Sequence, residues 1–271
     1  MDLIKQRLPA DSLAADKGLI VFAHRGGGGC WPENTMLAFA NAVALGVDAL
    51  ETDIQRSVDG HLVMIHDPFV DRVTEGSGRV ADMTLAQLQR LDAGYRWTRD
   101  GLTFPFRGQG LRIPTLAELF DAFPHIWINV DIKQHETAVV DQFAAMIEQY
   151  EMADRMMVGS FDEATVWRFR RVCPQVKTAA SLSEVARLLL LSRLGLSRWF
   201  RSPATSLQIP ERHGLLPLVT PALVRAAQRH QIGVHVWTVD DYAAMKRLIA
   251  RGVDGLMTDY PERLLRLLGR K

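Results

Sequence analysis

The stretch Ala49-Leu50-Glu51-Thr52-Asp53-Ile54-Gln55 begins the part of the sequence that decides the fold. We predict a β-strand here, and because side chains two positions apart share one face of a strand, Glu51 and Asp53 point the same way. The Asp59-Gly60 step and the apolar run that ends at His66 then predict a hairpin. With these two residues at the tip of the turn, His66 lies directly opposite Asp53.

A second chemically rich segment precedes this strand. The predicted strand Leu19–Ala23 leads to His24 and Arg25, which are followed by the four glycines Gly26–Gly29. Such a run lets the backbone pass close to another group, or simply turn. Pro32 to Thr35 then opens a predicted helix that continues to Leu45.

Strand and helix patterns alternate regularly in the second half of the chain. Each further predicted strand is followed by a helical pattern, and these strands are Trp127–Ile132, Met156–Ser160, Lys177–Ser181, Ser206–Ile209, Gly233–Val239 and Gly255–Asp259. With the first two strands they make eight βα units, the number in a closed (β/α)8 TIM barrel. We therefore predict a barrel domain at 19–271 with a small insertion at about 67–113, after an N-terminal extension at 1–18.

A doubly wound open sheet is the alternative fold for this pattern. A doubly wound open sheet needs fewer strands, and Gly26–Gly29 is not a GxGxxG dinucleotide fingerprint. The 271 residues, of which 48% are hydrophobic, suffice for one large barrel or two smaller domains. The net charge of +1 gives no electrostatic case for a nucleic-acid partner.

The cysteine content and the apolar runs bear on the compartment. Cys30 and Cys173 are the two cysteines of the chain, and they form no CxxC pair, which fits a reduced compartment and argues against a structural zinc site. The first residues contain no signal-peptide core, and no run reaches the roughly 18 apolar residues of a membrane span. We expect a soluble cytoplasmic protein.

Carboxylates are predicted to meet at the carboxyl ends of the strands, where barrel enzymes keep their active sites. Asp131 and Lys133 share one face of their strand, so Asp131 converges with Glu51 and Asp53. Three crowded carboxylates repel one another unless a cation compensates them, and their hard oxygen atoms suit Mg²⁺ or Ca²⁺.

Cations and histidines complete the expected site. Arg25 and Lys133 beside a metal suit a phosphate group, whose oxygens they share with the metal. His24 and His66 supply a proton acceptor and a proton donor that titrate near neutrality. His235 lies one step below Trp237 on the same strand face, so we expect it in the interior of the barrel. Glu33 either braces Arg25 or favours the start of the following helix.

Taken together, several motifs resemble the glycerophosphodiester phosphodiesterase family over nearly the whole chain. They are Ala23-His24-Arg25-Gly26 with Pro32-Glu33-Asn34-Thr35, Glu51-Thr52-Asp53, Asp59-Gly60 with His66-Asp67, Asp131-Ile132-Lys133, Val236-Trp237-Thr238-Val239, and Gly252-Val253-Asp254-Gly255 with Thr258-Asp259. The resemblance implies metal-dependent hydrolysis of glycerophosphodiesters to sn-glycerol 3-phosphate and an alcohol.

The resemblance also implies a role for each site residue. His24 and His66 would be the acid/base pair; Glu51, Asp53 and Asp131 would hold the metal; Arg25 and Lys133 would bind the phosphate, and Trp237 would line the substrate pocket. The attacking group would be the glycerol 2-hydroxyl, through a cyclic phosphate, with water as the alternative. We assign His24 as proton acceptor and His66 as donor.

This chain departs from the family pattern at two positions. The family more often has Glu in place of Asp131, and the Asp-Ile-Lys sequence looks closer to the spider-venom phospholipase D enzymes. Asp240 stands where the family often has Asn. A lysophospholipase D action on single-chain lipids is the alternative enzyme function, and a catalytically silent barrel is the alternative class. A silent barrel predicts loss of a histidine or carboxylate, and all are present.

The segment 196–201 suggests a further partner. It combines Trp199 and Phe200 with Arg198 and Arg201, a composition that suits an anionic membrane surface, with ordinary packing as the alternative. We therefore expect a small-molecule glycerophosphodiester as substrate and, as a hypothesis, a transient membrane-surface contact through these residues.

Overall fold

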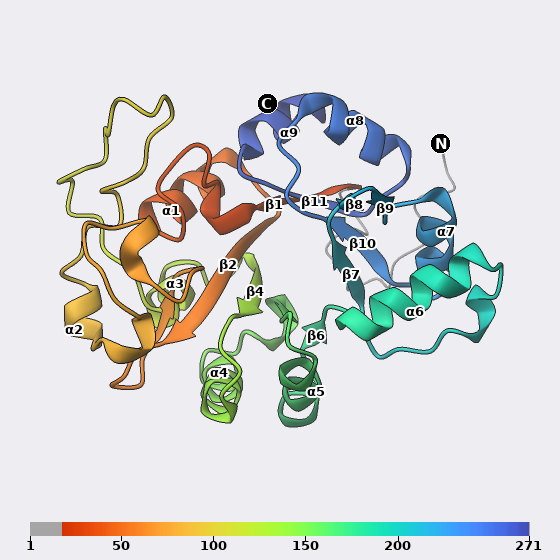
Figure 1. The fold of residues 1–271 in the computed structure, drawn as a ribbon, viewed down its shortest axis with the longest axis horizontal. Helices are drawn as coiled ribbons and strands as arrows, with labels where there is room; N and C mark the ends of the chain where they lie inside the picture. Colours follow the sequence, from red (N-terminus) through yellow and green to blue (C-terminus); the bar gives the residue numbers. More distant parts are fainter. Residues whose placement is uncertain (1–17, 271) are drawn as a thin grey trace.

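The computed structural model describes residues 18–270, so all of the predicted N-terminal extension except Gly18 lies outside the described residues. Eight parallel strands form the centre (Figure 1): β1 (Ile20–Ala23), β2 (Ala49–Arg56), β4 (Trp127–Ile132), β5 (Met156–Gly159), β6 (Lys177–Thr178), β7 (Ser206–Ile209), β10 (Gly233–Val236) and β11 (Gly255–Thr258). Their order is β6-β5-β4-β2-β1-β11-β10-β7, and a parallel bridge from Ala179 to Ser206 joins the two end strands. The predicted (β/α)8 barrel is confirmed, and the doubly wound sheet is wrong.

Helices lie around the outside of these strands (Figure 1): α1 (Met36–Leu45), α3 (Leu116–Ala122), α4 (Thr137–Gln149), α5 (Glu163–Val172), α6 (Leu182–Arg193), α7 (Pro221–Arg229), α8 (Tyr242–Ala250) and α9 (Pro261–Leu267). Local side chains set where they begin. The Thr35 hydroxyl accepts a hydrogen bond from the Ala38 amide, and Thr115 forms a capping box with Glu118.

Both faces of the barrel strands are buried, as expected for a parallel sheet covered by helices. Alternate residues such as Val21 and Leu50 pack outward against the helices, whereas Phe22 and Met257 pack in the barrel interior. His235 is also buried there, with its ring centroid 4.9 Å from that of Phe22, so its predicted interior position is confirmed.

The hairpin after β2 differs from the prediction by one residue. Strand β3 (Leu62–Met64) pairs antiparallel with β2, and Ile54 lies opposite Met64. The turn holds an extra residue because the Ser57 amide bonds to the His61 carbonyl and Gly60 has φ of 91°. The expected direct pairing of Asp53 with His66 is therefore wrong, and Asp53 bonds through its carbonyl to the amide of Ile65.

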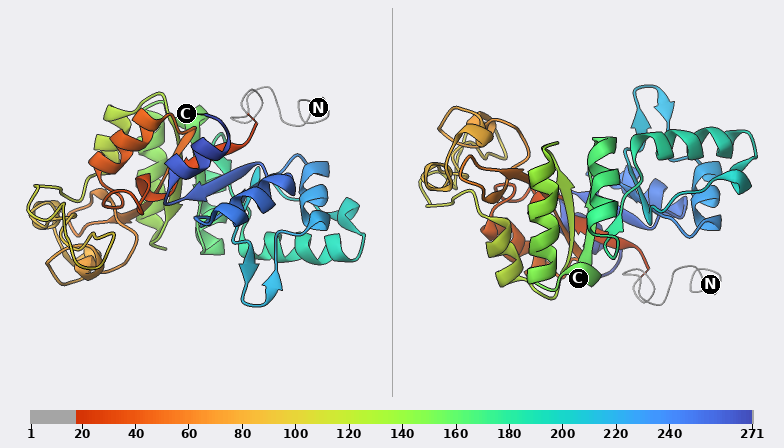
Figure 2. Two further views of the ribbon diagram at one scale, coloured as in Figure 1. Left: turned by 90° about the horizontal axis from the view of Figure 1, so that it is seen from above. Right: turned by 90° about the horizontal axis from the view of Figure 1, so that it is seen from below.

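The segment between β3 and α3 folds against this hairpin. It contains the short helices η2 (Val70–Arg72), η3 (Val80–Asp82) and α2 (Leu85–Leu88), and it stands at one side of the barrel (Figure 2). A small apolar cluster, which includes Val70, Val80 and Leu88, packs it onto Val63 and Ile65. The segment reaches the glycine-rich loop as well, because Trp97 Nε1 donates a hydrogen bond to the Gly28 carbonyl at 2.9 Å.

The segment proposed to touch a membrane follows α6. It forms the turn η5 (Ser197–Trp199), in which Trp199 is 64% exposed. Phe200 is wholly buried in the main core, with its ring 5.6 Å from that of His230, so the expectation that it faces a membrane is wrong. No helix within residues 18–270 is long and apolar enough to cross a membrane.

Candidate active site

His24 stands at the end of β1, in the short helix η1 (His24–Gly26), and contacts two carboxylates. Its Nδ1 lies 2.7 Å from Oδ1 of Asp259, which directly follows β11, and its Nε2 lies 3.9 Å from Oε2 of Glu51. Burial opposes the charged ring, but Glu51 and Asp259 outweigh it and raise the pKa of His24. Asp259 orients the imidazole, a role that the sequence prediction did not assign to it.

Arg25 adopts a left-handed conformation, with φ of 51°, which is uncommon for a residue other than glycine. Carboxylates on three sides hold it: its amide donates to Glu51 Oε2 at 2.9 Å, its Nη1 lies 3.0 Å from Glu33 Oε1, and its Nε lies 3.2 Å from Asp53 Oδ2. The prediction that Glu33 braces Arg25 is therefore confirmed.

The glycines after Arg25 allow close passage of the backbone rather than only a turn. Gly26 has φ of 80°, and a Cβ atom there would lie 2.8 Å from the Cβ of Ala38 in α1. A larger residue would be strained and would push the loop away from the helix. This loop therefore seats the backbone of Arg25 close to the carboxylates of β2.

The three predicted carboxylates lie on neighbouring strands. Asp53 of β2 is in register with Asp131 of β4, so their predicted convergence is confirmed. Lys133 joins them, with its Nζ 3.0 Å from Asp53 Oδ1 and 2.6 Å from Asp131 Oδ2. Asp53 also accepts a hydrogen bond from Asn34 Nδ2 at 3.1 Å, a contact that sequence reasoning missed.

These carboxylates differ in how well their charge is compensated. Burial and the neighbouring Asp53 raise the pKa of Glu51 to about 7. Burial also raises the pKa of Asp131, despite the opposing effect of Lys133. Burial acts in the same sense on Asp53, but Lys133, Arg25 and His66 outweigh it and lower its pKa. Burial thus favours the neutral forms of Glu51 and Asp131, whereas its cationic neighbours keep Asp53 charged.

His66 follows β3, which pairs with β2 along the edge opposite β4, and it approaches the same carboxylates. Its Nδ1 lies 2.5 Å from Asp67 Oδ1, and its charge influences the pKa of both Asp53 and Asp131. Arg72 of the insertion donates from Nε to Asp67. Arg72 was not predicted as a site residue, because no local pattern links it to a strand end.

An aromatic pair borders the charged residues. Trp237, half-buried just beyond β10, has its ring centroid 5.7 Å from that of Phe161 in an edge-on arrangement. Lys133 Nζ lies 5.5 Å from the Phe161 ring centroid. Phe161 was not predicted, although its place after the end of β5 was a usable signal. Together the two rings offer an apolar wall beside a cation.

The donor atoms suit a hard divalent cation, although the residues themselves already form ion pairs. Within residues 18–270, no three His, Cys, Asp or Glu side chains group as ready metal ligands, and Lys133 lies between Asp53 and Asp131. Two permanent cations, Arg25 and Lys133, touch these three carboxylates, and His24 adds a positive charge next to Glu51 only when it is protonated. A bound Mg²⁺ or Ca²⁺ would stabilise the charged forms of Glu51 and Asp131, whose pKa values are raised in its absence.

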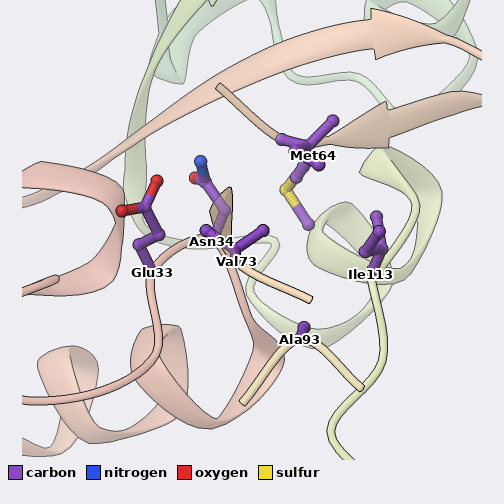
Figure 3. A pocket seen from close by; sticks show the side chains of 7 residues that line it. Glu33, Asn34, Met64, Val73, Ala93 and Ile113 are labelled. Atoms are coloured by element: carbon purple, nitrogen blue, oxygen red, sulfur yellow. The ribbon is translucent and has the colours of Figure 1, made fainter. Parts of the chain in front are cut away.

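A small cavity lies behind the site, between the hairpin and the insertion. Figure 3 shows its lining, in which Glu33 and Asn34 stand beside apolar side chains; the lining residues are Glu33, Asn34, Met64, Ile65, Val73, Ala93 and Ile113. None of them is a cation, and the Glu33 carboxylate is already paired with arginines. An anionic ligand needs positive partners, which the barrel mouth offers in Lys133 and Arg25 and the lining of this cavity does not.

Comparisons with known proteins agree with this geometry. The model of the glycerophosphoryl diester phosphodiesterase family matches residues 24–263. A glycerophosphodiester phosphodiesterase of Caldanaerobacter subterraneus subsp. tengcongensis is 34% identical over 254 residues, covering 92% of this chain and 97% of that protein. A lysophospholipase D of Mus musculus is 29% identical over 267 residues, covering 89% of this chain and 83% of that protein.

A solved structure gives the same result. The glycerophosphoryl diester phosphodiesterase domain of a Mycobacterium tuberculosis protein superimposes with a TM-score of 0.83 at 25% identity, covering 94% of this chain and all of that one. The matched region contains both histidines, all three carboxylates and both cations of the candidate site. The chain therefore belongs to the glycerophosphoryl diester phosphodiesterase family.

Proposed function

We propose that this protein hydrolyses glycerophosphodiesters to sn-glycerol 3-phosphate and an alcohol, with a divalent cation and two histidines. The observation that carries the proposal is the meeting of His24, Lys133 and three carboxylates at one end of the barrel strands. Family membership supports the same reaction. The cation, Mg²⁺ or Ca²⁺, would be held by Glu51, Asp53 and Asp131, and when bound it would offset negative charge on the phosphoryl oxygens.

The histidines would move the protons. Because Nδ1 of His24 is engaged by Asp259, its Nε2 is the nitrogen left to accept a proton from the attacking hydroxyl. His66, held through Nδ1 by Asp67, would donate a proton to the leaving alcohol. Arg25 and Lys133 would orient the phosphate, and in-line displacement would need the two histidines on opposite sides of the phosphorus.

The attacking group in this proposal is the 2-hydroxyl of the substrate's own glycerol. That hydroxyl is already held next to the phosphorus, so an intramolecular attack that forms a cyclic phosphate gains from proximity. A 2-deoxyglycerol analogue of glycerophosphocholine lacks this nucleophile. We expect its turnover to be lost, and turnover near the rate of the natural compound would show that water attacks.

Lysophospholipase D action is a second candidate. The aromatic wall of Phe161 and Trp237 beside Lys133 is suited to an apolar portion of a substrate, and the relative from Mus musculus is a lysophospholipase D. Lysophosphatidylcholine and glycerophosphocholine can be compared at equal concentration. A higher kcat/KM on the lysolipid, reduced by Trp237→Ala, would favour this second activity.

The main proposal is tested by choline release from glycerophosphocholine. We expect turnover that EDTA abolishes and added Mg²⁺ or Ca²⁺ restores. Turnover that resists chelation would remove the metal assignment. His24→Ala should inactivate the enzyme, and an active His24→Ala variant would remove the assigned proton acceptor.

A cytoplasmic location is part of the same proposal. It is supported by the free thiols of Cys30 and Cys173, both buried. Fractionation of cells that express the protein would test it, and recovery from an extracellular fraction would contradict it.

A further inference from the structure

Positive charge is concentrated in one part of this chain. Residues 164–239, which run from α5 past the end of β10, contain eleven Arg or Lys and two acidic residues, whereas the rest contains 21 basic and 29 acidic residues. Both acids of this part are paired, Glu184 with Arg170 and Glu211 with Arg247. The small net charge of the whole chain therefore conceals a strongly basic region.

The exposed face of α6 in this region carries apolar side chains. Leu188 and Leu189 belong to the stripe of α6 that packs into the core. On the opposite stripe, one turn apart, Leu190 is 58% exposed and Leu194 is 60% exposed. Trp199 of η5 is exposed as well, so large apolar side chains follow one another along this element.

The turn η5 lies against α6 and brings further arginines to this face. Arg187 of α6 donates a hydrogen bond to the carbonyl of Arg201, and its guanidinium lies 5.0 Å from the ring centroid of Phe200. The guanidinium of Arg198 lies 5.0 Å from the ring centroid of Trp199. Residues 185–210 contain four arginines and no acidic residue. Figures 1 and 2 place α6 and α7 on the side of the barrel away from the insertion.

We propose that the α6 surface, formed by Arg187, Leu190, Arg193, Leu194, Arg198 and Trp199, docks reversibly onto an anionic lipid bilayer. Leucines and a tryptophan interleaved with arginines match the boundary between headgroups and acyl chains, where Trp is favoured and basic residues attract anionic lipids. The absence of any acidic residue from 185–210 favours a uniformly anionic bilayer over a protein surface, which usually carries charges of both signs. Binding of this kind is separate from catalysis, so it goes beyond the proposed function.

Vesicle sedimentation of the full chain tests the proposal. Vesicles of phosphatidylcholine alone are compared with equal mixtures of phosphatidylcholine and phosphatidylglycerol, at low and high salt. We expect binding to the anionic vesicles that high salt weakens, because exposed charges are screened. The variant Leu194→Ser/Arg198→Gln/Trp199→Ala should reduce the partition coefficient by about tenfold or more, since it removes two apolar anchors and a charge.

A matched control isolates the α6 surface. Leu102→Ser/Arg90→Gln changes an 84% exposed leucine and an exposed arginine of the insertion, and it should bind vesicles as wild type does. Hydrolysis of water-soluble glycerophosphocholine should be the same in all three proteins, so a failed catalytic proposal and a failed docking proposal are told apart. Absence of vesicle binding by wild type, or equal binding by the α6 variant, would overturn the proposal. A wild type that forms dimers the variant cannot form, without binding vesicles, would assign the α6 surface to a second copy and overturn it equally.

Discussion

Arg72 of the insertion binds both carboxylate oxygens of Glu33 in the loop before α1, with Nη1 and Nη2 each 2.7 Å from an oxygen. Its Nε donates to Asp67, the partner of His66, while Glu33 also holds Arg25. Burial of Glu33 disfavours its charged form, but Arg72 and Arg25 outweigh that effect and lower the pKa of Glu33. The Arg72 guanidinium thus links Asp67, which holds the proposed catalytic His66, to Glu33, which holds the proposed phosphate ligand Arg25.

Replacing Arg72 should impair catalysis more than folding. In Arg72→Gln, Glu33 and Asp67 lose their shared partner, and misplacement of Arg25 and His66 should lower kcat/KM by about 10- to 100-fold. Arg72→Lys should recover only part of the loss, because an ammonium cannot bind a carboxylate in the two-pronged way of a guanidinium. Kinetics on glycerophosphocholine and the Tm measure the two effects, with Arg90→Gln of the insertion as control. Unchanged kcat/KM in Arg72→Gln would contradict this role.

Asp259 should matter through His24. Asp259→Asn removes the charge that orients the imidazole and stabilises its protonated form, so kcat should fall by about 100-fold or more with little change in KM. Asp240→Asn is the matched control, since Asp240 Oδ1 accepts hydrogen bonds from the Thr258 hydroxyl and the Asp259 amide, and an asparagine oxygen can accept both. Equal losses in the two variants would point to loop damage instead of a role of Asp259 on the histidine.

Glu51 and Asp53 should respond differently to neutralisation in the absence of metal. Asp53→Asn removes one of the two carboxylates that Lys133 and Arg25 each contact, so it should cost about 2 kcal/mol of unfolding free energy. Glu51→Gln relieves repulsion around a carboxylate whose pKa is about 7, so stability should stay the same or rise.

The effect of added metal on the Tm should distinguish the same two variants from wild type. We expect both to lose the rise in Tm that Mg²⁺ or Ca²⁺ gives the wild type, because a ligand that binds only the folded state stabilises it. Urea unfolding in EDTA and Tm with added cation are the measurements. A full cation-dependent rise in either variant would exclude that residue as a ligand.

His235 should make stability depend on pH. Burial in the barrel interior lowers its pKa to about 4 from an ordinary value of 6.5, and its Nδ1 has no hydrogen-bond partner within the described residues. The unfolded chain therefore binds the extra proton first as pH falls. Proton binding to the unfolded chain favours unfolding. The free energy of unfolding is therefore unaffected by His235 above pH 6.5 and falls by about 3 kcal/mol as pH drops from there toward 4.

The variant His235→Gln isolates this effect. Its side chain stays neutral, so the stability advantage of wild type over the variant should shrink by about 3 kcal/mol between pH 7 and pH 4. Urea unfolding at each pH measures the difference. A difference that does not vary with pH would show that His235 is not held neutral by the fold.

Local patterns in the sequence determined the elements and the faces of their side chains. The two-residue period of a strand was enough to align Glu51, Asp53 and Asp131, and the capping side chains of Thr35 and Thr115 were enough to start α1 and α3. These features depend on residues only a few positions apart, so the chain carries their information locally.

Tertiary structure alone decided which distant side chains meet. His24 and Asp259 are 235 positions apart and touch because β1 and β11 pair when the barrel closes. The one-residue shift of the β2–β3 hairpin and the burial of Phe200 likewise depend on turn geometry and on neighbours far along the chain. Sequence periodicity specifies a face but not what packs against it, because that choice is made by the closure of the sheet and the packing of the helices around it.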